Sequence, residues 1–211
     1  MNRGDQRVEA LNPMQRRIHQ AALRLFAARG AEQVSVSDLA NEAGVARGTI
    51  YNNVQSMDVL FEAVAGRLSA EMHERVQKSF GAVSDPAYRL ANGIRLFIRR
   101  AHEEPQWGAF IHRYSMSNAS LRELFVSQAM VDLMSGLSSG RYSFRQEQMM
   151  SAISLTASTV LGSIFLVLEG HSTWRNAGTD AAEFTLRALG IAPEEARALA
   201  NHPLPPLPPL D

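Results

Sequence analysis

The chain has 211 residues, 45% of them hydrophobic and 20% charged, which fits one globular domain or two small ones and excludes global disorder. The 21 Lys and Arg residues balance the 21 Asp and Glu residues, so bulk charge does not draw the chain to nucleic acid or acidic membranes, although these totals allow a local basic face. The sequence has no Cys, which excludes disulfides, thiolate metal sites and cysteine nucleophiles and favours a cytoplasmic location.

Two segments bear on export and membranes. Residues 1–13 contain charges but no apolar stretch after them, so we predict no signal peptide. Residues 148–168 contain no charge, and 21 residues are enough to span a bilayer. Six of these residues are Ser or Thr. We therefore predict a soluble helix buried on most of its circumference, with a membrane span as the alternative, and we expect no membrane partner.

Apolar residues recur every three or four positions along nearly the whole chain, which predicts an all-α fold. In the first half, residues that typically start and stop helices predict four of them. These run from Pro13 to Gly30, from Val36 to Gly44, over about 46–54, and for about 24 residues between a Ser56 cap and Gly81.

The second half carries similar signals with longer helices. They are predicted at about 84–104, 107–114 and 120–136, then from the Ser143-x-x-Gln146 capping motif to Gly170, from Asp180 to Gly190, and from Pro193 onward. The tail 201–211 holds five of the nine Pro residues. We predict a solvated tail that is extended or disordered, with a proline-rich ligand segment as the alternative.

The most informative pattern is SVSDLANEAGVARGTIYNNVQSMDVL at 35–60. It predicts two short helices joined at Gly44, which can adopt the positive φ that a tight turn often requires. Ala40 is small enough for the second helix to cross close to the first, and Val45 and Ile50 point into a small core. This geometry is a helix-turn-helix, whose second helix enters the DNA major groove. The alternative is a pair of purely structural helices.

The segment GVARGTIYNNVQSMDVL, preceded by SDLANEA and RRIHQAALRLFAARG, resembles the DNA-binding domain of the TetR (tetracycline repressor) family of bacterial regulators. The similarity covers about residues 13–70; the rest resembles the family only in helical style and in the RALGI segment at 187–191. The resemblance implies an all-α homodimer of about nine helices per chain, with an N-terminal three-helix helix-turn-helix domain and a C-terminal helical bundle. The implied units are a flexible arm at 1–12, a DNA-binding domain at 13–60, a ligand-binding and dimerisation domain at 61–200, and the Pro-rich tail at 201–211.

The resemblance also implies which residues contact DNA. Ser37 would lie against phosphate, helped by the amides of a helix N-terminus. Arg47 would read guanine or hold a phosphate, and Asn side chains can pair with adenine. The full implied set is Ser37, Arg47, Gly48, Thr49, Tyr51, Asn52 and Asn53.

Three positions depart from the family pattern. The family often has an aromatic residue or His at the position of Asn53, Phe at that of Val54, and Lys at that of Met57. Met57 removes a phosphate contact. Residues 1–55 hold seven Arg against five acidic residues, a surplus of two positive charges. We therefore predict few phosphate ion pairs, a shallow salt dependence, and reliance on base contacts and dimer geometry.

For the C-terminal half the predictions are a ligand pocket and a dimer face, with ordinary core packing as the alternative to each. Aromatic and Met side chains on the middle helices would line an adaptable apolar cavity. The pocket candidates are Phe97, Trp107, Phe110, His112, Tyr114, Met130 and Met134. In the dimer that the resemblance implies, small residues of the uncharged helix would let two helices approach closely. The dimer candidates are Ala152, Leu155, Ser158, Gly162, Phe165 and Leu186.

Catalytic and metal-binding patterns are missing from the sequence. His102, His112 and His171 are far apart and lack the i, i+4 spacing of a helical metal site, so we expect no metal and no other cofactor. No nucleophile elbow, Gly-rich phosphate loop or H-E-x-x-H motif is present, so we expect no enzyme. The sequence predicts a cytoplasmic, homodimeric repressor that a small ligand releases from a palindromic DNA operator. The alternative is a helical ligand-binding or scaffold protein with little DNA affinity.

Overall fold

The computed structural model describes residues 11–81 and 83–209, which leaves most of the predicted arm outside the described residues. Within these ranges the chain forms ten α-helices, rather than about nine, and two short 3₁₀ helices, with no strand. The helices are α1 (Pro13–Arg29), η1 (Ala31–Gln33), α2 (Val36–Ala43), α3 (Arg47–Asn53), α4 (Met57–Phe80), α5 (Pro86–Glu103), α6 (Pro105–Tyr114), α7 (Ala119–Ser138), η2 (Gln146–Gln148), α8 (Met149–Leu168), α9 (Trp174–Ala188) and α10 (Pro193–Asn201). The predicted all-α class is confirmed.

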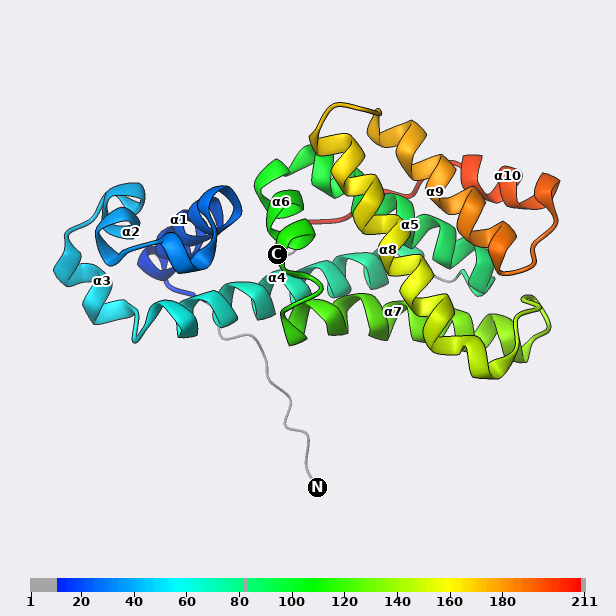
Figure 1. Ribbon diagram of the computed structural model, residues 1–211, viewed down its shortest axis with the longest axis horizontal. Coiled ribbons are helices and arrows are strands. Elements are labelled where there is room, and N and C mark those ends of the chain that lie inside the picture. The colour runs from blue at the N-terminus through cyan, green and yellow to red at the C-terminus, as the bar shows by residue number, and fades with distance from the viewer. Residues whose placement is uncertain (1–10, 82, 210–211) are drawn as a thin grey trace, which may run out of the picture.

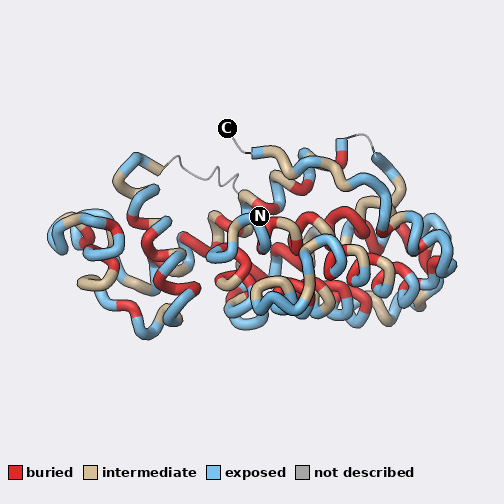
Figure 2. Tube along the Cα trace, turned by 90° about the horizontal axis from the view of Figure 1, so that it is seen from above, coloured by how far each residue is buried: buried red, intermediate tan, exposed pale blue. Residues whose placement is uncertain are grey.

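Helix α4 connects two parts of the molecule (Figure 1). At its N-terminal end lie α1, α2 and α3, and along its C-terminal part lie α5 to α10. It packs against α1 on one side and against α5 and α7 on the other. Buried residues run through both parts, as Figure 2 shows, so the helix-turn-helix unit and the bundle share a continuous apolar core.

Of the first four helices, α1, α2 and α4 begin at a side-chain cap, whereas α3 has none. Asn12 Oδ1 accepts the Gln15 amide at 2.9 Å, while Gln15 Oε1 accepts the Asn12 amide at 3.1 Å, a reciprocal capping box at the start of α1. Ser56 Oγ accepts the Val59 amide at 3.2 Å and so caps α4, which has the predicted 24 residues. The start of each of these three helices is thus fixed by side chains within a few residues of it.

Helix α7 begins at Ala119, within one residue of its predicted start, and the Asn118 side chain caps it by accepting the Leu121 amide at 3.1 Å. Two other helices begin elsewhere than predicted. Helix α8 follows the η2 turn rather than a Ser143 capping motif. Helix α9 is capped by the Thr173 hydroxyl, so Asp180, its predicted first residue, lies inside the helix.

Helix α8 is the uncharged helix, and it has one buried face and one exposed face. One face packs on α5, α7 and α9, but Leu155, Ser158, Gly162 and Phe165 are exposed, so the prediction of burial on most sides is wrong. By length and composition, Gln146–Leu168 is the one stretch in the described ranges that could cross a membrane, and 39% of its apolar window is buried against the bundle. An apolar stripe remains uncovered in the single chain.

The Pro-rich tail is held against the bundle. The Arg75 side chain on α4 donates to the Pro208 carbonyl at 2.9 Å, and Arg95 on α5 donates to the His202 carbonyl at 2.8 Å. Leu204 and Leu207 pack on the core. The tail is non-helical, as predicted, but it is not fully solvated: Leu204, Pro205, Leu207 and Pro208 are half-buried. Tail carbonyls that lack helix partners accept hydrogen bonds from the two arginines instead.

A substitution at Gly136 would test how closely α7 packs against Tyr142. A Cβ atom at this position would overlap the ring of Tyr142, which is buried. We expect Gly136→Ala to lower the free energy of unfolding by about 2–3 kcal/mol, measured by urea denaturation, because the ring has no free space to enter. Gly66→Ala is the matched control, since Gly66 also lies within a helix but has open space beside it. It should raise stability by up to ~1 kcal/mol. Equal stability of the two variants would contradict this packing.

Candidate nucleic-acid interface

The turn between α2 and α3 is held in place by α1. Gly44 has φ of 63°, in the left-handed region that favours glycine. Arg17 on α1 donates to the Gly44 carbonyl at 2.9 Å, and a Cβ atom at Gly44 would lie only 2.9 Å from the same guanidinium nitrogen. The buried side chains of Leu39 and Ile50 join the two helices to the core. These contacts fix the direction in which α3 projects.

Helix α3 presents a polar face to solvent. Tyr51 is 68% exposed, and Arg47, Gly48, Asn52 and Asn53 are exposed beside it. The Asn53 side-chain Nδ2 donates to the Thr49 carbonyl at 2.8 Å, which leaves its second N–H hydrogen and its Oδ1 for other partners. The helix carries no carboxylate, and an exposed face of amide, phenol and guanidinium groups can meet phosphates and base edges without charge repulsion.

Two further positions from the predicted interface lie at helix starts. Ser37 is half-buried in the first turn of α2, beside the capping box that Ser35 forms with Asp38. Met57 is the first residue of α4, half-buried and packed on the core. The structure therefore brings all seven predicted DNA contacts to α2 and α3.

Most basic side chains of this unit hold the fold together. Arg24 pairs with Glu42 at 2.6 Å, and Arg29 pairs with Asp38 at 3.3 Å, which ties α1 to α2. The Ser35 hydroxyl and amide hydrogen bonds, with the nearby Arg29, hold the pKa of Asp38 below its usual value. Within the described residues, Arg16, Arg17 and Arg47 make no ion pair, and Arg17 is engaged by the Gly44 carbonyl. The positive charge available to phosphates is small.

A hydrogen-bonded joint connects this unit to the bundle. The Tyr114 hydroxyl at the end of α6 accepts the Ala31 amide at 2.7 Å and donates to the Phe26 carbonyl at 3.2 Å. Its ring lies 4.9 Å from both the Phe61 and Phe110 ring centroids. Tyr114, a predicted pocket residue, therefore lies between the two parts of the molecule, where α6 contacts α1.

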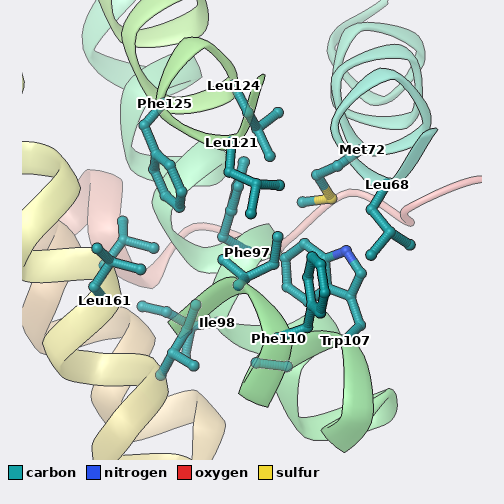
Figure 3. Close-up of a cluster of buried hydrophobic side chains, with 14 of the residues drawn as sticks. Leu68, Met72, Phe97, Ile98, Trp107, Phe110, Leu121, Leu124, Phe125 and Leu161 are labelled. Carbon is teal, nitrogen blue, oxygen red and sulfur yellow. The ribbon is translucent and has the colours of Figure 1, made fainter. Parts of the chain in front are cut away.

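The other predicted pocket residues do not surround one cavity. The rings of Phe97 and Trp107 lie 6.0 Å apart in the buried core of Figure 3, with Phe110 beside them. His112 is exposed and packs 5.7 Å from the ring of Phe165 on α8. Met134 is 57% exposed and Met130 half-buried on α7. Helical spacing identified apolar residues but not which helix faces meet.

The interior of the bundle holds a cavity of about 40 Å³ between α5, α7 and α8. Phe97 and Phe125, with ring centroids 5.1 Å apart, line it. Asp132 and Thr156 add polar atoms, and Asp132 pairs with Arg89 at 2.7 Å. The predicted pocket residues include neither Asp132 nor Thr156. The sequence did offer a signal for Asp132, which is an acidic residue flanked on both sides by apolar residues. The cavity is far below the 300–1,000 Å³ of typical ligand pockets.

The predicted dimer residues divide between surface and core. Leu155, Ser158, Gly162 and Phe165 share the exposed face of α8. Ala152 and Leu186 are buried within the subunit and belong to its core. Leu166 and Phe184, the latter 61% exposed, add to the apolar surface and were missed. The helical period could have found Phe184, because it lies outside the stripe of buried residues on α9.

No group of three or more His, Cys, Asp or Glu side chains that could hold a metal occurs among the described residues.

This arrangement is that of a helix-turn-helix DNA-binding protein with an appended helical bundle. The model of bacterial regulatory proteins of the tetR family matches residues 18–64, and the model of the tetracycline repressor-like C-terminal domain matches residues 85–202. The chain belongs to the TetR family of transcriptional regulators.

Individual relatives agree with this assignment. Two uncharacterised helix-turn-helix transcriptional regulators of Mycobacterium tuberculosis are each 29% identical over 94 residues, which is 44% of this chain and 46% of theirs. The matched segment thus spans less than half the length of these relatives. The crystal structure of RolR with resorcinol superposes with a TM-score of 0.71 and 25% identity, covering 92% of this chain and 96% of that one. The fatty acid degradation regulator FadR from Bacillus halodurans has a TM-score of 0.73 and 18% identity over 87% of this chain and all of FadR, and shares the fold.

Proposed function

We propose that this regulator is a homodimeric repressor that binds a palindromic DNA operator and is released by a small ligand. The observation that carries the DNA-binding part is the face of α3, which exposes Arg47, Tyr51 and Asn52 and has no carboxylate. The Gly44 turn and its Arg17 contact hold this helix in a fixed direction. The residues proposed to contact DNA are Ser37, Arg47, Gly48, Thr49, Tyr51, Asn52 and Asn53. The protein would act in the cytoplasm as a binding protein rather than an enzyme.

The exposed stripe of α8 supports the homodimer. Leu155, Phe165 and Leu166 are each at least 40% exposed, and Ser158 and Gly162 lie between them without bulk. A second copy related by two-fold symmetry would cover this stripe, since the same surface serves both subunits. Two α3 helices would then meet two half-sites one helical turn apart.

Few phosphate contacts follow from the charges of the DNA-binding unit. Arg47, the one arginine of the proposed contact set, would neutralise about two phosphates in a dimer, which gives a slope of about −2 for log K against log salt concentration. Fluorescence anisotropy with a labelled operator would measure this slope over about a sixfold range of salt concentration, from about 50 to about 300 mM. A slope steeper than about −7 would contradict the prediction, because it would require more neutralised phosphates.

The ligand-binding part rests on the aromatic interior of the bundle. RolR, the relative described above, has been crystallised with resorcinol, and a small aromatic molecule is the kind of ligand that Phe97 and Phe125 could contact. The 40 Å³ cavity would have to enlarge, which moves α5, α7 or α8. Because α6 packs on both α5 and α8, such a displacement would reach α6. Through Tyr114 it would act on α1 and shift the population toward a state whose α3 helices no longer match the operator. A ligand that binds without changing operator affinity would contradict this mechanism.

The alternative function is a helical ligand-binding or scaffold protein that has lost DNA affinity, and Met57 is the observation that favours it. Selection of binding sites from random DNA distinguishes the two, performed at low and at physiological salt. We expect enrichment of a palindromic sequence at both salt concentrations. Failure to enrich any sequence would support the alternative.

A further inference from the structure

A second, larger cleft lies on the outside of the bundle, between α5, α9 and α10, which run side by side in Figure 1. Its volume is about 850 Å³, compared with about 40 Å³ for the interior cavity. Helix α5 separates the two: Ile94 and Phe97 line the interior cavity, whereas Arg95 and Arg99 line the cleft. The cleft is therefore a separate site from the proposed effector cavity.

The seam between α5 and α9 places arginines around one tryptophan. The Arg95 side chain lies 3.5 Å from the position of a Cβ atom on Gly178, and one turn along, the Arg99 guanidinium lies 5.6 Å from the centroid of the Trp174 ring. The guanidinium of Arg175 lies 4.4 Å from the same ring centroid. Trp174 thus holds two cations against its ring and marks the centre of the cleft.

Three arginines, Arg95, Arg99 and Arg175, and two carboxylates, Glu103 and Asp180, line the cleft, so its positive charge is only partly compensated. Arg99 pairs with Glu103 at 2.7 Å. Arg95 donates only to neutral oxygens, those of the Asn92 side chain and the His202 carbonyl, and burial lowers its pKa. Among the described residues neither Arg95 nor Arg175 makes an ion pair. A half-buried guanidinium without a carboxylate is costly unless an anion approaches it.

We propose that this cleft binds a small organic anion through its phosphate or carboxylate groups. Arg95 and Arg175 would hold the charged groups by charge-assisted hydrogen bonds, for which the guanidinium fork is well suited. Asn176, Thr179 and Asn201 supply neutral polar groups for the rest of the molecule. The cleft lies at the N-terminal end of α9, and neither Phe184 nor any residue of the proposed α8 dimer stripe lines it. The inference does not depend on DNA binding or on the interior cavity.

Tryptophan fluorescence provides a direct test, because the chain has two Trp residues and Trp107 is buried in the core. In the full-length protein at constant ionic strength, iodide should quench Trp174 more effectively than caesium, since the arginines attract anions. Citrate and inorganic phosphate serve as probes. We expect at least one of them to protect Trp174 from iodide with saturation, and Trp174→Phe to abolish this response.

The variants Arg175→Gln and Arg95→Gln should each weaken the saturating response about tenfold, the loss expected for one charge-assisted hydrogen bond. Arg122→Gln, an exposed arginine on α7, should leave it unchanged. Circular dichroism would confirm that each variant is folded. Because Arg175 is exposed, its variant also tests the site if Arg95→Gln misfolds. Equal quenching by iodide and caesium, a linear response to both probes, or an equal loss in the Arg122 variant would overturn the proposal.

Discussion

The double variant Tyr51→Ala with Asn52→Ala is expected to lose operator binding while remaining as stable as the parent protein. Both side chains are exposed on α3, so their removal leaves no cavity, and the free energy of unfolding should change by less than about 0.5 kcal/mol. In a dimer each change removes two contacts. At about 1–3 kcal/mol for each base contact, operator affinity should fall at least about 100-fold. Anisotropy titration with the selected operator measures the first quantity and thermal unfolding the second.

A matched control for this variant is Arg122→Ala with Glu123→Ala. These two residues are also adjacent and exposed on a helix, but they lie on α7, in the bundle. Operator affinity should be unchanged in the control. If the α3 variant bound the operator normally, Tyr51 and Asn52 would not belong to the recognition surface and α3 would not be the helix that enters the groove.

The second large effect is expected from Ser158→Arg. Ser158 lies in the middle of the exposed stripe of α8, between Leu155 and Gly162, where a second subunit would bury it. Burying two arginines at a two-fold axis without carboxylate partners costs several kcal/mol. The dimer dissociation constant should therefore rise at least about 100-fold, as measured by sedimentation equilibrium. Operator affinity should fall with it, because one α3 helix contacts only one half-site.

Ser135→Arg is the control for the dimer variant. It places the same charge on an exposed serine of α7, outside the proposed α8 stripe. This protein should have the oligomeric state and operator affinity of the parent. A Ser158→Arg variant that stayed dimeric would show that α8 does not form the interface, even if the parent protein is a dimer.

The helix-turn-helix unit could be predicted closely from sequence because its determinants are local. Asn12 and Ser56 cap helices through atoms three residues away, and Gly44 meets a conformational need of its own backbone. The positions of Leu39 and Ile50 follow from the helical period. Within this unit, the predicted helix bounds differ from those of the structure by about one residue, and the exposed face of α3 is the predicted one.

The bundle was predicted less closely because its sites depend on which helix faces meet. Phe97, Trp107 and Tyr114 all read as apolar helical residues, yet one lines a small cavity, one fills the core and one joins the bundle to α1. The Pro-rich composition of the tail is typical of solvated segments, and it does not show that the tail packs on the bundle. The partners that hold it, Arg75 and Arg95, lie more than a hundred residues away in sequence.

By itself, the sequence determined an all-α regulator with a helix-turn-helix at 35–60, since capping, turn formation and helical period act within a few residues. It also determined that this unit carries little spare positive charge. Only the tertiary structure decided that Arg24 and Arg29 are engaged in ion pairs, that Tyr114 connects α6 to α1, and that an arginine-lined cleft forms around Trp174. These features need groups from distant segments to meet, and no local pattern specifies which surfaces of ten helices will pack together.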